Sequence, residues 1–282
     1  MKNLFKYLLI CFVCGFFISC DKTEEIAFKS GDCFIKSISY FENSPDTEYD
    51  FNSEGRLLAA RQLGALDGRL IATKKYTYKP NGKVETCTYN GILITTYFYE
   101  NELLTRTETK NNSGAITATQ LIQQNPTSKL IEKLINKDYL GEITHNFSYD
   151  EDGNCTKIEG FNKDGKPLYV STYSGFVNGK NAFATFKGLP FRPFEFIIGE
   201  IPVLGAPVNF GKASKYQTES KILETANQGI NNPSDLIERF NTKWEYKFNG
   251  NGYPTISTSY DITGGKAPSL NGERNYVYSK CD

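Results

Sequence analysis

Residues 147–168 read FSYDEDGNCTKIEGFNKDGKPL and place two glycine-containing turns on either side of an alternating apolar run. The first turn, residues 150–154, combines three acids, a glycine and an amide in the order DEDGN. Such a turn is compatible with a cation-binding loop, with catalytic carboxylates, or with the corner of a β-hairpin. The other parts of the chain that share this pattern distinguish among the three interpretations.

One pattern recurs along the chain: an aromatic residue, any residue, a second aromatic residue, a turn that usually ends in glycine, and an alternating run. Its copies begin at Tyr49, Tyr76, Tyr97, Phe147 and Tyr246. Their spacing fits a repeating unit of about 21 to 27 residues, with one degenerate copy near residues 120–135 and an insertion later in the chain.

Each unit contains enough residues for two strands. Threonines that alternate with Tyr, Ile and Val place one face of each strand toward a core. Asn-Gly, Asp-Gly and Ser-Gly pairs supply the positive φ angles that tight hairpin turns need. We therefore predict an all-β fold: an antiparallel meander of β-hairpin repeats that forms a large curved sheet or incomplete barrel, with an irregular or partly helical insertion.

A structural role is favoured for the acidic turns. Residues 79–82, KPNG, occupy the equivalent place in a sister copy and carry no carboxylate. We therefore expect neither a metal site nor a cofactor. We also expect no enzymatic activity, because the single histidine, His145, lies in a predicted strand, no Gly-x-Ser-x-Gly motif occurs, and the abundant carboxylates single out no catalytic pair.

The N-terminal residues have the character of a secretion signal. A basic start precedes an apolar run at residues 7–18, which is shorter than the ~20 residues that span a bilayer. Residues 17–20, FISC, resemble the lipobox of bacterial lipoproteins, whose cysteine is acylated and becomes the new N-terminus. The resemblance implies that Cys20 is a lipid anchor. An ordinary signal peptide with an unmodified Cys20 is the alternative.

The expected domain organisation is a signal peptide at residues 1–19, a lipidated N-terminus and flexible tether at 20–32, and a single β-repeat domain at 33–282. Residues 21–25, DKTEE, resemble the acidic export signal of Bacteroides-type lipoproteins. This resemblance implies a surface-exposed position on the outer membrane, with a periplasm-facing position as the alternative. Basic and acidic residues balance at 32 each, which disfavours a nucleic-acid partner.

Four cysteines remain in the predicted domain: Cys33, Cys87, Cys155 and Cys281. An even number of cysteines in an oxidising compartment is typical of disulfide-bonded proteins, and three pairings are possible. A bridge between Cys33 and Cys281 would tie the first strand to the last. Four buried thiols are the alternative.

An apolar segment lies within the insertion, which we expect at about residues 176–240. Residues 188–210 contain four prolines, which exclude a continuous helix or a central strand. Either these residues fill the hollow of the curved sheet, or Phe191, Phe194 and Phe196 form an apolar contact loop for a partner.

A helix is also predicted within the insertion, beginning near Ser234 or Asp235. Leu236, Ile237 and Phe240 would form its apolar face. Such a face is more typical of a helix that covers a sheet than of a binding helix.

The repeats resemble the tyrosine-aspartate repeats of Rhs-type proteins. Residues 246–255, YKFNGNGYPT, are similar to the terminal repeat of a family of Bacteroides-type outer-membrane lipoproteins of unknown function. This resemblance covers about residues 35–280 and implies a porin-like incomplete β-barrel, although the last copy decays over residues 261–280. It implies no catalytic residues.

We expect a lipid-anchored envelope protein that acts as a non-enzymatic binding or interaction module. Its partners would be the membrane, through the N-terminal lipid, and a glycan or an envelope protein. A glycan-active hydrolase with an unrecognised carboxylate pair is the alternative.

Replacing Cys20 with Ala should release the protein from membranes, because the substitution removes the sulfur that carries the lipid. Membrane fractionation of cells that produce the two forms measures this effect. An unchanged membrane fraction for Cys20→Ala would contradict the anchor assignment.

Overall fold

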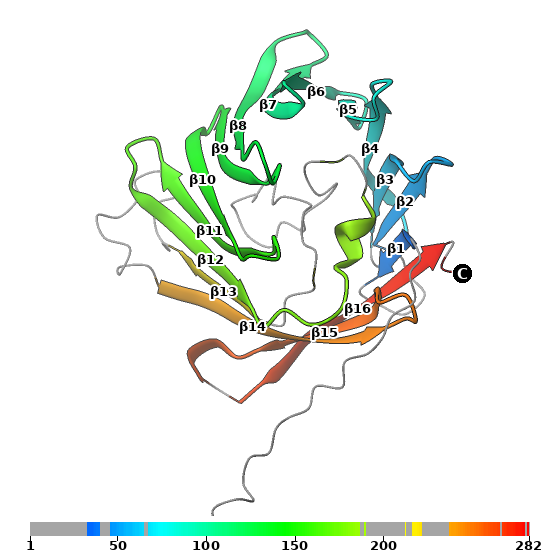
Figure 1. Ribbon diagram of the computed structural model, residues 1–282, viewed down its shortest axis with the longest axis vertical. Helices are drawn as coiled ribbons and strands as arrows, with labels where there is room; N and C mark the ends of the chain where they lie inside the picture. Colours follow the sequence, from blue (N-terminus) through cyan, green and yellow to red (C-terminus); the bar gives the residue numbers. More distant parts are fainter. Residues whose placement is uncertain are drawn as a thin grey trace, which may run out of the picture.

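The structure is a computed structural model that describes residues 33–39, 46–64, 67–186, 189, 212, 216–221, 237–265, 267–279 and 281 (Figure 1). No helix in these ranges is long and apolar enough to cross a membrane. Two short 3-10 helices occur, η1 (Ala182–Thr185) and η3 (Thr263–Gly265). The strands are β1 (Phe34–Ser39), β2 (Thr47–Phe51), β3 (Leu57–Leu63), β4 (Leu70–Tyr78), β5 (Val84–Tyr89), β6 (Leu93–Glu100), β7 (Leu103–Asn111), β8 (Ile116–Gln124), β9 (Ile131–Asp138), β10 (Gly141–Tyr149), β11 (Cys155–Asn162), β12 (Pro167–Ser174), β13 (Tyr216–Lys221), β14 (Ile237–Phe248), β15 (Pro254–Asp261) and β16 (Ser269–Ser279).

Every strand pairs antiparallel with its neighbours in the chain, and the last strand returns to the first. Strand β16 pairs with β1 at five positions, from Phe34↔Ser279 to Ser39↔Asn275. Among the described residues, β1 pairs with β2 at two positions. The strands therefore form a ring whose shortest junction is β1–β2. The predicted antiparallel meander, which forms one large curved sheet, is confirmed.

A disulfide joins the two ends of the ring. Cys33, just before β1, is bonded to Cys281, just after β16, and their Cα atoms are 4.6 Å apart. The side-chain amide of Asn251 lies against this bond, with its nitrogen 3.4 Å from Cys33 Sγ. The other two cysteines of the ring, Cys87 and Cys155, are buried thiols. The structure thus contains the predicted bridge between the first strand and the last, and it forms none of the three pairings that would use all four cysteines.

Hairpin turns alternate between the two ends of the ring. The turns at residues 52–56, 79–83, 150–154 and 249–253 lie at the end that carries the disulfide, which we call the disulfide end. The turns that join β3 to β4, β5 to β6, β7 to β8, β9 to β10, β11 to β12 and β15 to β16 lie at the far end. The two ends therefore present different sets of turns to the surroundings.

The repeats place equivalent side chains at equivalent positions near the disulfide end. The second aromatic residue follows a β-bulge, as at Phe51, Tyr78 and Tyr149. After the turn, the next strand begins with a buried residue at or near its first position. These buried residues are Leu57, Val84, Leu104, Ile131, Cys155 and Pro254.

Tyrosine hydroxyls link neighbouring strands at these positions. Tyr78 donates to the carbonyl oxygen of Leu57 at 2.7 Å, Tyr149 to that of Ile131 at 2.7 Å, and Tyr278 to that of Pro254 at 2.9 Å. In the degenerate copy the side-chain oxygen of Gln124 instead accepts from the backbone of Leu104 at 2.6 Å. Each link ties the end of one strand to the beginning of its neighbour.

Strand β16 contains a further copy of the aromatic pair, Tyr276 and Tyr278. Tyr276 shares a hydrogen bond with Ser257 at 2.9 Å, and both tyrosines pack against the core. The expectation that the repeat decays over residues 261–280 is therefore wrong for this pair. Sequence comparison missed the copy because no glycine turn follows it before Cys281.

The turn at residues 150–154 is a hairpin corner. Asp150 N donates to Asn154 O, and Gly153 N donates to Asp150 O, each at 3.0 Å. Gly153 has a φ of 80°, in the left-handed region that favours glycine. The same two backbone bonds recur in the turns that begin at Asn52, Lys79 and Asn162, as a structural interpretation of the glycines requires.

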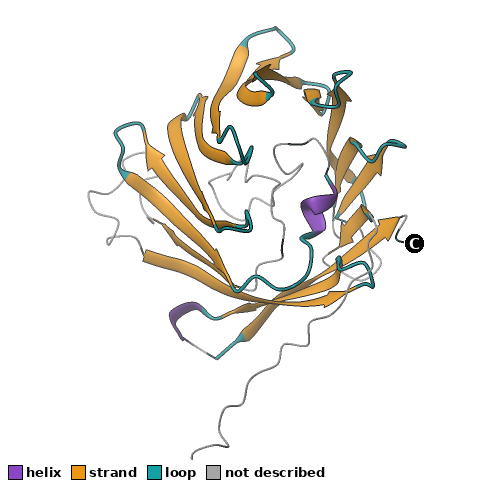
Figure 2. Cartoon of the chain, viewed as in Figure 1, coloured by secondary structure: helices purple, strands orange, loops and turns teal. Residues whose placement is uncertain are grey.

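The connection from β12 to β13 begins inside the ring, where Figure 2 shows η1. Asn181 accepts a hydrogen bond from Phe183 N at 2.9 Å and so caps η1. The Phe186 ring lies 5.1 Å from Tyr49 and 6.0 Å from Phe51, measured between ring centroids. Leu189, within the predicted plug, is buried in the same core. The first part of the insertion thus fills part of the hollow.

The remaining prediction for the apolar segment falls outside the described residues. Phe191, Phe194 and Phe196 belong to this part of the chain. Their assignment to a plug or to a contact loop therefore remains a prediction.

Two expectations about the rest of the insertion are corrected. Strand β13 and the beginning of β14 lie inside the predicted range 176–240 and continue the meander. Ile237 and Phe240, predicted on a helix, instead belong to β14 and pair with Lys221 and Glu219. Leu236 lies outside the described residues. Strand β14 has hydrogen-bonding neighbours on both sides, β13 and β15, and this tertiary pairing overrides the local helix signals.

Replacing Gly153 with Ala should lower the free energy of unfolding by about 1–2 kcal/mol, because a Cβ is unfavourable at positive φ. The added methyl group meets only Leu130 Cδ1, at 3.8 Å, so backbone conformation alone causes the effect. Urea denaturation measures the change. Gly250 is the matched control: its φ is not positive and a Cβ there has open space. Equal losses for Gly153→Ala and Gly250→Ala would contradict this account.

Candidate functional site

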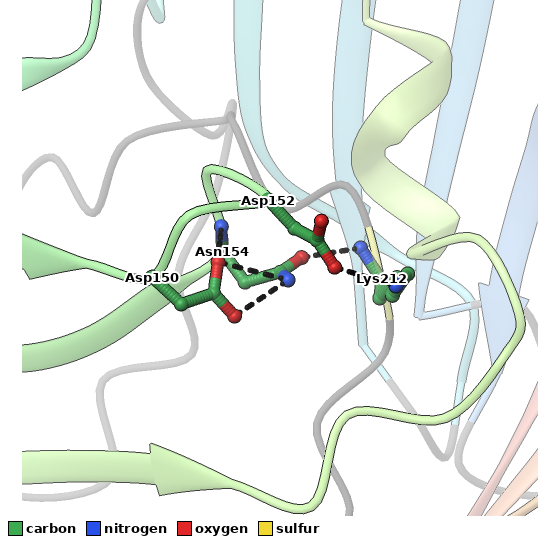
Figure 3. Close-up of polar contacts among 4 residues, drawn as sticks. All are labelled: Asp150, Asp152, Asn154 and Lys212. Carbon is green, nitrogen blue, oxygen red and sulfur yellow. Dashed lines mark hydrogen bonds and ion pairs between the residues drawn. The ribbon is translucent and has the colours of Figure 1, made fainter.

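A polar cluster joins the turn at residues 150–154 to the insertion (Figure 3). We call Asp150, Asp152, Asn154 and Lys212 the turn–insertion cluster. The side-chain nitrogen of Asn154 donates to both carboxylate oxygens of Asp150, at 3.1 and 2.8 Å. The backbone N–H of Asn154 donates to the same carboxylate at 2.8 Å. These bonds fix the orientation of the Asn154 amide, which is only 1% exposed.

Lys212 brings the insertion to this turn. Its backbone N–H donates to Asn154 Oδ1 at 3.0 Å, and its ammonium group lies 2.8 Å from Asp152 Oδ2. Lys212 also forms an isolated β-bridge with Lys180, whose N–H donates to Gly252 O at 2.8 Å. Two turns of the disulfide end therefore hold the two segments of the insertion that contain Lys180 and Lys212, which we call its arms.

The electrostatics of the cluster fit this structural role. Burial raises the pKa of the Asp150 carboxyl, but hydrogen bonds from Asn154 and from the Asp152 backbone outweigh burial and lower it overall. The hydrogen bond with Asp152, together with its negative charge, raises the pKa of Lys212. Protein donors thus occupy the oxygens that a cation-binding loop would offer. Within the described residues, no group of three or more His, Cys, Asp and Glu side chains is placed to hold a metal ion.

A groove of about 590 Å³ lies beside the cluster, between the turn at residues 150–154 and the turn that joins β8 to β9. Like Asp150, two other carboxylates of the groove are bonded within the chain. Glu132 accepts a hydrogen bond from the Asn125 side chain at 2.9 Å, and Asp152 forms an ion pair with Lys212. The groove combines aromatic, amide, hydroxyl and acidic groups, which suit hydrogen-bonded binding of a polar ligand. It is lined by Asn125, Ser128, Leu130, Glu132, Phe147, Tyr149, Asp150, Glu151, Asp152 and Gly153.

His145 is a buried structural residue of β10. Its Nδ1 atom lies 2.6 Å from the hydroxyl of Tyr169, and both side chains are buried. Gly160 makes this arrangement possible, because a Cβ at that position would lie 2.1 Å from the Tyr169 ring. Burial lowers the pKa of His145 to about 4, so the imidazole is neutral near pH 7.

The site residues predicted from the sequence do not come together at one place in the structure. Cys33 and Cys281 are bonded at the disulfide end, whereas Cys20 lies outside the described residues. Sequence reasoning missed the pairing of Asn154 with Lys212, which lies 58 residues further along the chain. One signal was available: the sister turns at 52–56, 79–83 and 162–166 end in a basic residue, whereas this turn ends in an amide.

No protein-family model and no curated protein matches the sequence. Solved structures that match include a porin-like protein from Bacteroides uniformis, with 14% identity, 90% of this chain and 99% of that chain covered, and a TM-score of 0.40. A porin-like protein from Bacteroides vulgatus has 9% identity, covers 88% of this chain and 99% of its own, and has a TM-score of 0.37. The Tc holotoxin pore of Photorhabdus luminescens has 12% identity over 79% of this chain and 11% of that chain, with a TM-score of 0.26.

Replacing Asp152 with Asn should increase tryptic cleavage after Lys212 about two- to fivefold, because the substitution removes the ion pair that holds this arm. Timed proteolysis with mass analysis of the products measures the rate. Asp164→Asn is the matched control, since Asp164 occupies the equivalent turn position and, among the described residues, forms an ion pair with its neighbour Lys163 and not with the insertion. Equal cleavage rates in the two variants would contradict the proposed attachment.

The buried His145 should make stability depend on pH. Its folded pKa of about 4 lies below the ordinary value of about 6.5, so the unfolded chain is protonated first as the pH falls. The titration of His145 therefore leaves the free energy of unfolding unchanged above about pH 6.5 and lowers it as the pH falls toward 4.

Between pH 7 and pH 5 the wild-type protein should lose about 2 kcal/mol more stability than His145→Gln. Urea denaturation at the two pH values measures this difference. His145 is the single histidine of the chain, so its imidazole NMR signals give an independent titration. Parallel pH profiles for the two proteins would show that His145 titrates normally.

Proposed function

We propose that this chain is a lipid-anchored cell-envelope protein that acts as a non-enzymatic binding or interaction module. The order of features along the chain supports this function. A secretion-like apolar run precedes Cys20, a polar stretch at residues 21–32 follows, and the ring of strands begins immediately after Cys33. In the proposed arrangement, Cys20 carries the lipid and the ring is exposed on the outer membrane.

The Cys33–Cys281 disulfide is the observation that carries the proposed location. It closes the ring across the whole length of the domain, with a sequence separation of 248 residues. Disulfides persist in oxidising compartments and are rare in the reducing cytosol. A bond in this position therefore supports an extracytoplasmic site of folding.

The groove beside the turn–insertion cluster supports binding over catalysis. A general acid of a glycosidase needs a carboxyl group with a raised pKa. In the groove, Asp150 has a lowered pKa, and Glu132 and Asp152 are bound to donors within the chain. The exposed hydroxyl group of Ser128, beside the Tyr149 ring, fits a glycan or a polar segment of an envelope protein.

Thiol trapping in intact cells tests the location. Alkylation under denaturing conditions should modify Cys87 and Cys155 without prior reduction. Cys33 and Cys281 should be modified only after their disulfide is reduced. The Cys33→Ser/Cys281→Ser double variant should lose this dependence on reduction, whereas Cys87→Ser should keep it. Four thiols that react without reduction would contradict the proposed compartment.

A glycan panel tests the binding mode. Stoichiometric binding without turnover, weakened by Ser128→Ala, is the expected result. Turnover that disappears in Glu132→Gln or Glu151→Gln would replace the binding module with the hydrolase alternative.

A further inference from the structure

The far end of the ring is rimmed with exposed large apolar side chains. Eight of the eleven strongly exposed large apolar residues in the described part of the chain lie at the tips of far-end hairpins, and each is 44–88% exposed. Scattered single residues of this kind need no explanation, but gathering at one end of a molecule marks an interaction surface. We call these residues the apolar rim: Leu70, Ile71, Ile92, Ile94, Ile116, Tyr139, Leu140 and Leu270.

Seven of the eight rim residues lie on four successive hairpins, and the eighth, Leu270, lies at the β15–β16 tip. The tips of β3–β4, β5–β6, β7–β8 and β9–β10 each carry at least one rim residue. The next tip, between β11 and β12, is polar and carries Lys163, Asp164 and Lys166. At the disulfide end, the turns at residues 52–56 and 150–154 are likewise polar. Leu58, 43% exposed, and Val277, 49% exposed, lie toward the disulfide end, so most but not all of the exposed large apolar side chains gather on this arc of the far end.

Local hydrogen bonds hold the tips of this arc in place. Asn90 accepts from the backbone of Thr73 at 2.6 Å, which joins the β5–β6 tip to β4. With its amide oriented as a donor, Asn112 bonds to the carbonyl oxygens of Gly91 and Ile92 at 3.3 and 3.1 Å. The rim residues on these tips are therefore presented before any partner binds.

The charges and spacing of the tips indicate what the rim contacts. The four apolar tips carry Asp67, Arg69, Lys110 and Asp138, two acids and two bases, so they offer no net charge for a charged partner. Successive tips are separated by two strands, or about 10 Å, and act as separate apolar fingers. Shallow insertion into a lipid interface suits separate fingers, because lipid needs no matching pockets, and tyrosine is enriched at that interface.

We propose that the apolar rim inserts into the surface of the bilayer that holds the lipid anchor. This inference rests on the proposed function in one respect, the lipid on Cys20. The tether of residues 21–32 can extend to about 40 Å. A nine-residue strand rises about 30 Å, and tilt shortens its length along the ring axis. The tether is therefore long enough to pass from the disulfide end to the bilayer that the rim contacts.

Tryptophan placed at the rim tests the proposal in the lipidated full chain. Tyr139→Trp, at the most exposed rim position, is compared with Lys163→Trp at the polar tip. The native Trp244 signal of the parent protein is subtracted from both. Each protein is mixed with an excess of phosphatidylcholine vesicles, with or without bromine on the acyl chains near the headgroups.

In vesicles, Tyr139→Trp should emit at shorter wavelength and lose about half of its emission or more to the bromine, whereas Lys163→Trp should change little. Equal quenching of the two variants, or none for Tyr139→Trp, would overturn the rim proposal. A blue shift of Tyr139→Trp without vesicles that grows with protein concentration would also overturn it and would assign the rim to a second copy of the chain.

The mass of the purified chain reports acylation at Cys20 independently of fluorescence. A chain without acyl groups would contradict the lipid anchor. Quenching of Tyr139→Trp in that chain would still decide whether the rim binds lipid. The mass therefore tests the lipid anchor, and the quenching separately tests the insertion of the rim into lipid.

Discussion

Pairing of the first strand with the last is the interaction on which the rest of the structure depends. Strand β1 bonds to β16 at five positions, and the Cys33–Cys281 disulfide lies beside that pairing. Without it, the meander would expose backbone donors and acceptors along both terminal strands, and such edges favour association with other chains. With it, the hairpins form a ring that has an interior to fill and two distinct ends.

Near the disulfide end, equivalent side chains of several repeats fill the interior. A bulge precedes the second aromatic residue, a turn follows, and a buried residue begins the next strand. Cys155 takes this last position where other repeats use Leu, Val, Ile or Pro, which explains the buried thiol as a packing residue. Gln124 takes the position of a tyrosine and keeps the link to the neighbouring strand through its side-chain oxygen.

The repeat made most of the fold predictable from the sequence, because spacing and alternation determine strands and turns locally. Gly153 illustrates this: its place in the pattern was enough to assign a hairpin corner. Local signals failed at Ile237 and Phe240, where pairing with distant strands decided the conformation. They also failed at Tyr276 and Tyr278, because the end of the chain replaces the turn that marks other copies.

The candidate site was less predictable than the fold. The acids of residues 150–154 attracted attention as individual groups, yet their role depends on Lys212, and no local pattern connects residues 58 positions apart. The apolar rim could not be predicted from the sequence for a related reason. Its members are ordinary strand residues in the sequence, and only the topology shows that they share one end of the ring.

The disulfide also determines how the protein bears mechanical load. A pull on the segment before Cys33 would reach the ring at that residue, which is covalently joined to Cys281. The force therefore enters the first and last strands together, and β1 cannot be peeled away from β16 one hydrogen bond at a time. Strands would have to slide past one another in shear, with many bonds resisting at once. The closure of the ring would therefore make the domain resist a pull applied at its N-terminal end.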